Sequence, residues 1–274
     1  MRLAGKVLHY WYFVIASVII ALTIAFLVNR YTIPLFQVSS TVMVNEPVKD
    51  GTSAAAVLYG SDIFQSTKSL TNESILLKTH ALALQTVQKL DFGVSYFQEG
   101  NVKLSELYGG NYLIDVDVDS TSSAIPYDVM FRVVFSNNKR AFKLTTEDGF
   151  WNSQFLDKEF LLGKQYNVSG FIFTLNASPE ESTYPLLFKV NNPIALAWQY
   201  AGALDVSPYA KGSSALTLKL SGPTPAKDID FLNAHMEMYK ENNLAIKNTN
   251  ATNTLKFIDE QLQQISDSLY FIES

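Results

Sequence analysis

One feature constrains this chain more than any other, an apolar run close to its N-terminus. No residue from Val7 to Asn29 carries a formal charge if His9 is neutral, and most residues after Tyr12 in this run are Val, Ile, Leu, Ala or Phe. A helix of about 20 apolar residues crosses a hydrocarbon core of ~30 Å, whereas a cleaved secretory signal has an apolar core of only about 7 to 15 residues. The run therefore predicts an uncleaved transmembrane helix over residues 7–28.

The charges that flank this run predict its orientation. Arg2 and Lys6 precede it, whereas only Arg30 follows closely and the next cation is Lys49. Basic residues are enriched on the cytoplasmic side of membrane helices. We therefore expect residues 1–30 to form a cytoplasmic tip and a membrane anchor in the lipid bilayer, and nearly everything after residue 30 to lie outside the cytoplasm.

The composition of the chain excludes several classes of protein. Hydrophobic residues make up 47% of the sequence and aromatic residues 13%, which excludes general disorder. Cysteine is absent, so neither disulfides nor Cys-ligated metal can stabilise the fold. The net charge is -5 and no run of Lys or Arg occurs, which argues against nucleic acid as a partner.

Hydrophobic periodicity predicts an α+β fold after the anchor. Alternating or β-branched runs predict strands at 37–44, 112–119, 129–135, 141–146, 171–175, 186–190 and 215–220. Asn137-Asn138 between two such runs and Ser169-Gly170 ahead of another are turn signals. Apolar residues at three- and four-residue spacing predict helix in residues 62–90, with a break near Thr71 and Asn72, and Asn192-Pro193 starts another helix.

A long helix is predicted at the C-terminal end. Thr224-Pro225 and Asp228 form a well-specified helix start. Further along, apolar residues follow the alternating three- and four-residue spacing of a coiled-coil seam; they are Leu255, Ile258, Leu262, Ile265, Leu269 and Ile272. Because this pattern is still running at Ser274, we expect the natural protein to continue with more heptads and then a second membrane span.

Three aspartates at alternate positions, Asp115, Asp117 and Asp119, resemble the start of a calcium-binding loop. The resemblance stops there, because position six of such a loop is Ser120 rather than Gly and position twelve is Pro126 rather than Glu. Apolar residues alternate with the aspartates, so the three carboxylates are predicted to lie on the solvated face of a strand.

No residue is assigned a catalytic, cofactor-binding or metal-binding role from the sequence, and no cofactor is predicted. His9, His80 and His235 lack the spacing of zinc ligands and are interpreted as interfacial, packed or surface imidazoles. Neither a phosphate-binding Gly-x-x-x-x-Gly-Lys-Ser/Thr loop nor a Gly-x-Ser-x-Gly elbow occurs. We therefore predict that this segment is not an enzyme.

Several strings, taken in their order along the chain, resemble one family. They are the strand at 36–45, Asn72-Glu-Ser-Ile-Leu-Leu-Lys78, Thr86-Val-Gln-Lys-Leu-Asp91, Ala203-Leu-Asp-Val-Ser-Pro208, Phe231-Leu-Asn233 and Phe257-Ile-Asp-Glu-Gln-Leu262. Together with the anchor they are similar to the polysaccharide co-polymerases, also called chain-length determinant proteins. The similarity is to the N-terminal part of the tyrosine-autokinase branch of exopolysaccharide transport, in its Bacteroidetes-type form.

The resemblance implies a function, a location and partners. It implies an oligomeric scaffold in the bacterial inner membrane, periplasmic after about residue 30, that regulates the chain length and export of a capsule, exopolysaccharide or O-antigen polymer. The implied partners are further copies of the chain, a polysaccharide polymerase and an outer-membrane export channel. Direct binding of polysaccharide and a C-terminal tyrosine autokinase domain in the full-length protein are left open.

The same resemblance suggests how the chain is divided. A membrane-proximal α/β domain would comprise residues 31–110 and 184–250, and the β-rich residues 111–183 would be an insertion into it. Residues 251–274 would begin a coiled-coil arm.

Two other functions are compatible with these residues. The first is the ectodomain of a membrane sensor or receptor, with residues 184–274 passing a signal inward. The second is a tethered enzyme with carboxylates such as Asp115 or Glu147 in a cleft, although no motif supports it.

Overall fold

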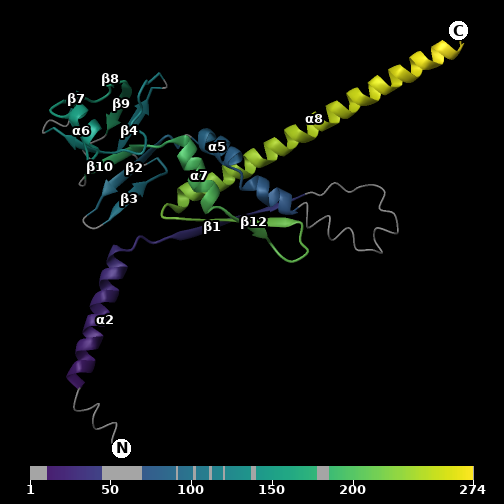
Figure 1. Ribbon diagram of the computed structural model, residues 1–274. Coiled ribbons are helices and arrows are strands. Elements are labelled where there is room, and N and C mark those ends of the chain that lie inside the picture. The colour runs from purple at the N-terminus through teal and green to yellow at the C-terminus, as the bar shows by residue number, and fades with distance from the viewer. Residues whose placement is uncertain are drawn as a thin grey trace, which may run out of the picture. The chain divides into compact units, whose positions relative to one another are not determined.

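The computed structural model of the chain has a mixed α/β fold (Figure 1). It describes residues 11–44, 70–90, 92–100, 103–110, 113–119, 121–136, 140–177 and 185–273. The chain packs into two compact units. One unit comprises residues 1–36, 94–191 and 222–224, and the other comprises residues 37–93, 192–221 and 225–274. We name the strand-rich residues 94–191 the sandwich unit and the second group the arm unit.

Helix α2, Trp11–Tyr31, is the N-terminal apolar helix, and no side chain in it is buried. The hydroxyl of Thr23 donates to the carbonyl of Ile19 at 2.8 Å, so this polar group is satisfied within the helix, as a lipid environment requires. Within the described ranges, α2 alone has the length and composition to cross a membrane. It could therefore anchor the chain, and it ends at Tyr31 rather than at residue 28.

Two antiparallel sheets make up the sandwich unit. The larger has the strand order β3 (Leu104–Leu107), β2 (Val94–Glu99), β10 (Leu186–Val190), β5 (Met130–Phe135), β6 (Ala141–Thr146) and β7 (Phe160–Leu161), and the smaller has the order β4 (Ile114–Val118), β9 (Phe171–Ala177) and β8 (Gln165–Val168). Helix α6, Gly149–Phe155, follows β6 and starts at Asp148, whose carboxylate accepts the N–H of Trp151 at 2.9 Å.

Phenylalanine rings fill the space between these two sheets. Phe131 of β5 stacks on Phe188 of the neighbouring strand at 5.3 Å and reaches Phe171 of the smaller sheet at 6.4 Å between ring centroids. Phe155 of α6 meets Phe131 edge-on at 5.4 Å. Since each such ring buries a large apolar surface, this cluster is the main source of stability in the sandwich unit.

The boundaries of the sandwich unit differ from those expected of an insertion at 111–183. Strands β2 and β3 precede that range and β10 follows it, yet they share one sheet with β5. Leu187 of β10, for example, lies opposite Phe97 of β2 on one side and Arg132 of β5 on the other. The structure therefore does not confirm residues 111–183 as a unit of their own, because the hydrogen-bonded sheet continues on both sides of them.

In the arm unit, helices pack beside a three-stranded sheet. The strand order is β1 (Phe36–Met43), β12 (Ala215–Gly222) and β11 (Asp205–Pro208). Helix α5 (His80–Lys89) packs against α7 (Pro193–Ala203) and against the start of α8 (Pro225–Glu273). Tyr200 of α7 stacks on Phe231 of α8 with ring centroids 4.0 Å apart.

One predicted helix boundary in the arm unit lies at the limit of the described residues. Residues 70–77 are helical, and the residues before Leu70 lie outside the described part of the chain, so the break predicted near Thr71 and Asn72 stays a prediction. A break that the sequence did not predict lies at Lys78 and Thr79, where the Thr79 hydroxyl accepts the N–H of Leu82 at 3.4 Å and thereby caps α5. The part of the prediction over residues 62–69 lies outside the described residues.

Helix α8 starts at Pro225, as the sequence predicts, and continues without interruption for 49 residues. The predicted boundary between residues 250 and 251 therefore falls inside a single helix. Figure 1 shows the second half of α8 extending beyond the other helices of the arm unit. A coiled coil is not confirmed, since no described segment of the chain packs along this half.

Candidate functional site

The outer half of α8 carries the first candidate site, an apolar stripe that we name the seam. It consists of Leu255, Ile258, Leu262 and Ile265, whose side chains are between 46% and 63% exposed. Burying a Leu or Ile side chain fully is worth about 1.5–3 kcal/mol. Packing of the seam on another helix would therefore release a substantial free energy.

A polar socket at the base of α8 joins this helix to the helices packed against it. Its centre is His235, which is completely buried against Phe231 and helix α5. The imidazole Nε2 lies 2.8 Å from the carbonyl oxygen of Leu77, which can only accept, so Nε2 carries a proton. The other ring nitrogen, Nδ1, lies 3.0 Å from the hydroxyl of Thr86.

The hydroxyl of Thr86 takes part in two hydrogen-bond contacts in this socket. The Thr86 hydroxyl also lies 2.8 Å from the carbonyl of Leu82, so one hydroxyl proton serves two acceptors when His235 is neutral. Burial lowers the pKa of His235 and keeps the ring neutral, while the bond to Leu77 opposes this shift. A single side chain thus joins α8 both to α5 and to the helical residues 70–77.

Further side-chain contacts near His235 join α8 to α5 and to the helical residues 70–77. The Tyr239 hydroxyl donates to the Glu73 carboxylate at 2.7 Å, and burial together with this carboxylate raises the pKa of Tyr239. Lys89 forms ion pairs with Glu237 at 3.0 Å and Glu241 at 3.2 Å. Because both ion pairs are well exposed, they orient the helix more than they stabilise it.

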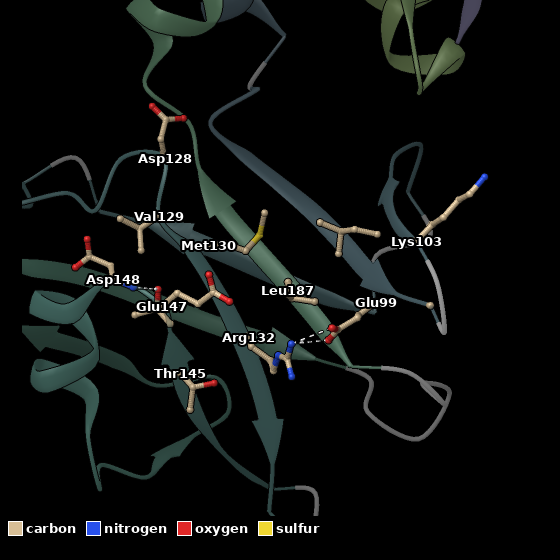
Figure 2. Close-up of a pocket in the computed structure, with 13 residues that line it drawn as sticks. Glu99, Lys103, Asp128, Val129, Met130, Arg132, Thr145, Glu147, Asp148 and Leu187 are labelled. Atoms are coloured by element: carbon tan, nitrogen blue, oxygen red, sulfur yellow. Dashed lines mark hydrogen bonds and ion pairs between the residues drawn. The ribbon is translucent and has the colours of Figure 1, made fainter. Parts of the chain in front are cut away.

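A second candidate site is a pocket of about 840 Å³ on the outer face of the larger sheet in the sandwich unit. Its lining comes from β2, β3, β5, β6, β10 and the loops beside them; among the residues are Glu99, Lys103, Asp128, Arg132, Thr145 and Glu147. Figure 2 shows Arg132 and Glu99 pointing toward each other near Leu187. The Arg132 guanidinium contacts both oxygens of the Glu99 carboxylate, at 3.0 and 2.7 Å.

The pocket combines hydrogen-bond donors and acceptors with a small apolar floor. Leu187 and Met130 supply the floor, and carboxylates of Asp128 and Glu147 line the side. Asp128 is paired with Lys189 at 3.4 Å. Such a lining can hold a hydroxyl-rich or cationic group, but among the described side chains it forms no nucleophile and base within hydrogen-bonding distance.

The three aspartates considered from the sequence lie on β4 or directly after it. Asp115 and Asp117 are exposed, whereas Ile114 and Val116, which alternate with them, are buried, so the predicted alternation is present in β4. The hydroxyl of Thr121 and its N–H both donate to Asp119 and lower the pKa of that carboxyl. In the part of the chain that the structure describes, no three His, Asp or Glu residues gather as metal ligands.

The two described histidines both have structural surroundings. His235 is packed, as discussed, and His80 stacks on Trp198 with ring centroids 4.3 Å apart. His9 lies outside the described residues. Of the two carboxylates considered for a tethered enzyme, Glu147 lines the pocket and Asp115 does not.

Neither the pocket nor the socket can be predicted from the sequence. Arg132 and Glu99 come from strands separated by β10, and Glu73 and Tyr239 are far apart in sequence. Of the three features, only the seam can be predicted from the sequence, because its signal is a local periodicity.

A comparison with the known protein families gives no match to this chain, and a comparison with curated proteins gives none either.

Proposed function

We propose that this chain is a membrane-anchored scaffold that works as a homo-oligomer in the biosynthesis and export of a bacterial polysaccharide. The observation that carries the proposal is the seam on α8, an exposed apolar stripe at coiled-coil spacing on a helix of 49 residues. An apolar helix that could anchor the chain accompanies it. The polysaccharide part of the proposal rests on the resemblance of the sequence to chain-length determinant proteins.

The architecture supports a scaffold more than a catalyst. The hydrogen bonds of His235 join the base of α8 to α5 and to the helical residues 70–77, which supports a role for α8 as a held platform for the seam. A seam of this kind gains free energy only by packing on other helices. In the proposed assembly those helices belong to further copies in the same inner membrane, with the polymerase and export channel as additional partners.

The functional part of this proposal is tested in the host cell. Deletion of the gene should change the length distribution of a surface or secreted polysaccharide, as measured by gel electrophoresis or size-exclusion chromatography of the extracted polymer. Complementation with the wild-type gene should restore it. Unchanged polymer length and amount, together with an altered response to an extracellular signal, would favour a sensor instead.

A further inference from the structure

Strand β1 stands at one edge of the sheet in the arm unit. The order β1, β12, β11 leaves one side of β1 without a strand in the described part of the chain. The strand is eight residues long, and none of its residues is buried. A free edge of this length is a template for pairing with another chain.

The sequence of β1 lacks the features that normally protect an edge. It reads Phe-Gln-Val-Ser-Ser-Thr-Val-Met, with no charged residue, proline or glycine. Edge strands that must stay unpaired usually carry Lys, Pro, a bulge or an inward-pointing charge. Val38 and Val42 face the packed side but are only half-buried, so the strand is incompletely covered.

A hydrogen bond just past the end of β1 shows which backbone groups face the neighbouring strand. The N–H of Val44 donates to the carbonyl of Ser214 at 2.8 Å, so the even-numbered peptide groups face β12. Because these groups alternate along a strand, those of Gln37, Ser39, Thr41 and Met43 face the free edge.

We propose that the free edge of β1 pairs with β1 of a second copy of this chain, antiparallel and around a two-fold axis through Ser40. This inference rests on the proposed homo-oligomer and adds a second contact to it. The register places Val38 opposite Val42 of the other copy, on the packed face of both sheets. Ser39 and Thr41 then form a hydrogen-bonded pair, which agrees with the groups that face the edge.

Two features favour a second copy over an unrelated strand. A two-fold axis normal to the sheet keeps each residue on its own face, so the alternation of half-buried and exposed side chains in β1 matches itself. The absence of charge from the strand removes like-charge repulsion between copies, which would otherwise oppose self-pairing. The result is a continuous six-stranded sheet from two arm units.

The absence of cysteine from the chain makes the test direct. In the full-length protein in membranes, Ser40→Cys should form an intermolecular disulfide under mild oxidation, because residues directly opposite in an antiparallel pair lie ~4.5–5.5 Å apart between Cα atoms. Ser221→Cys, an exposed serine on the central strand β12, is the matched control and should give a several-fold lower yield.

Charge substitutions at the paired exposed positions decide the register. In the Ser40→Cys background, S39K with T41K places lysines opposite each other and should lower the yield several-fold, whereas S39K with T41E places opposite charges together and should restore it. Equal yields for Ser40→Cys and Ser221→Cys, or no rescue by the Lys and Glu combination, would overturn the pairing. If such a negative result came with an oligomeric mass, the pairing of β1 would fail while the proposed assembly stood.

Discussion

His235 occupies the position from which α8 is held, and its surroundings determine what a substitution would cost. The side chain is completely buried, bonded to the Leu77 carbonyl and stacked near Phe231. We expect His235→Ala to lower the free energy of unfolding by about 2–4 kcal/mol, because it leaves a cavity and an unpaired buried carbonyl. Urea denaturation measures this, and His80→Ala, which removes a half-buried ring, should cost less than half as much.

The same histidine makes stability depend on pH in a definite direction. Burial places the pKa of His235 below its ordinary value of 6.5, so the unfolded chain binds this proton more readily than the folded one. Its contribution is complete above pH 6.5 and is lost as the pH falls from 6.5 toward the lowered folded pKa. The difference in unfolding free energy between wild type and His235→Gln should shrink over that window, and a constant difference would contradict it.

The turn between β8 and β9 permits a matched pair of substitutions. Ser169 and Gly170 both have positive φ, 51° and 90°, as a two-residue hairpin turn requires. A Cβ on Gly170 would lie 2.3 Å from the Ser123 hydroxyl oxygen, so Gly170→Ala should destabilise the protein by about 1–2 kcal/mol or more. Ser169→Gly should be nearly neutral. Equal thermal midpoints for the two variants would show that this turn is not formed.

At the scale of elements, the seam on α8 is the feature most open to experiment. Replacing Leu262 and Ile265 with Asp should weaken self-association at least tenfold without unfolding the arm unit, because both side chains are exposed in a single copy. Sedimentation measures the association, and circular dichroism checks the fold. Asn253→Asp with Gln263→Asp, both exposed and off the seam, is the control and should associate like wild type.

Elements with strong local signals could be predicted from the sequence. The strands at 141–146 and 186–190, the Ser169-Gly170 turn and the start of α8 at Pro225 agree with the structure. The two-residue strand β7 carries no periodicity, and α6 is a short helix whose start depends on Asp148. These two elements are fixed by packing around Phe155 and Phe160 rather than by a local pattern, so the sequence does not predict them.

The candidate sites likewise differ in whether a local sequence pattern predicts them. The seam lies within one helix and can be read from spacing, whereas the pocket needs Glu99, Arg132 and Thr145 to be brought together from three strands of one sheet. The break at Lys78 and Thr79 is not predicted from the sequence, although Thr79 caps α5 there. Local rules identify candidate caps and cannot show which of them are used without the surrounding contacts.

As a whole molecule, the chain carries three surfaces suited to a membrane-bound assembly. α2 could hold it at a membrane, the seam offers helix-to-helix contact, and β1 offers strand-to-strand contact. The seam and β1 are apolar or uncharged, and neither has a partner segment among the described residues. We infer that oligomerisation covers these two surfaces, whereas lipid would cover α2.

The mass of the full-length chain, extracted in mild detergent and measured by light scattering at micromolar concentration, tests this claim most directly. The account predicts a defined multiple of the monomer mass that falls toward the monomer in the Leu262→Asp, Ile265→Asp variant. A wild-type chain that is monomeric under these conditions, and equally monomeric in nanodiscs, would contradict it.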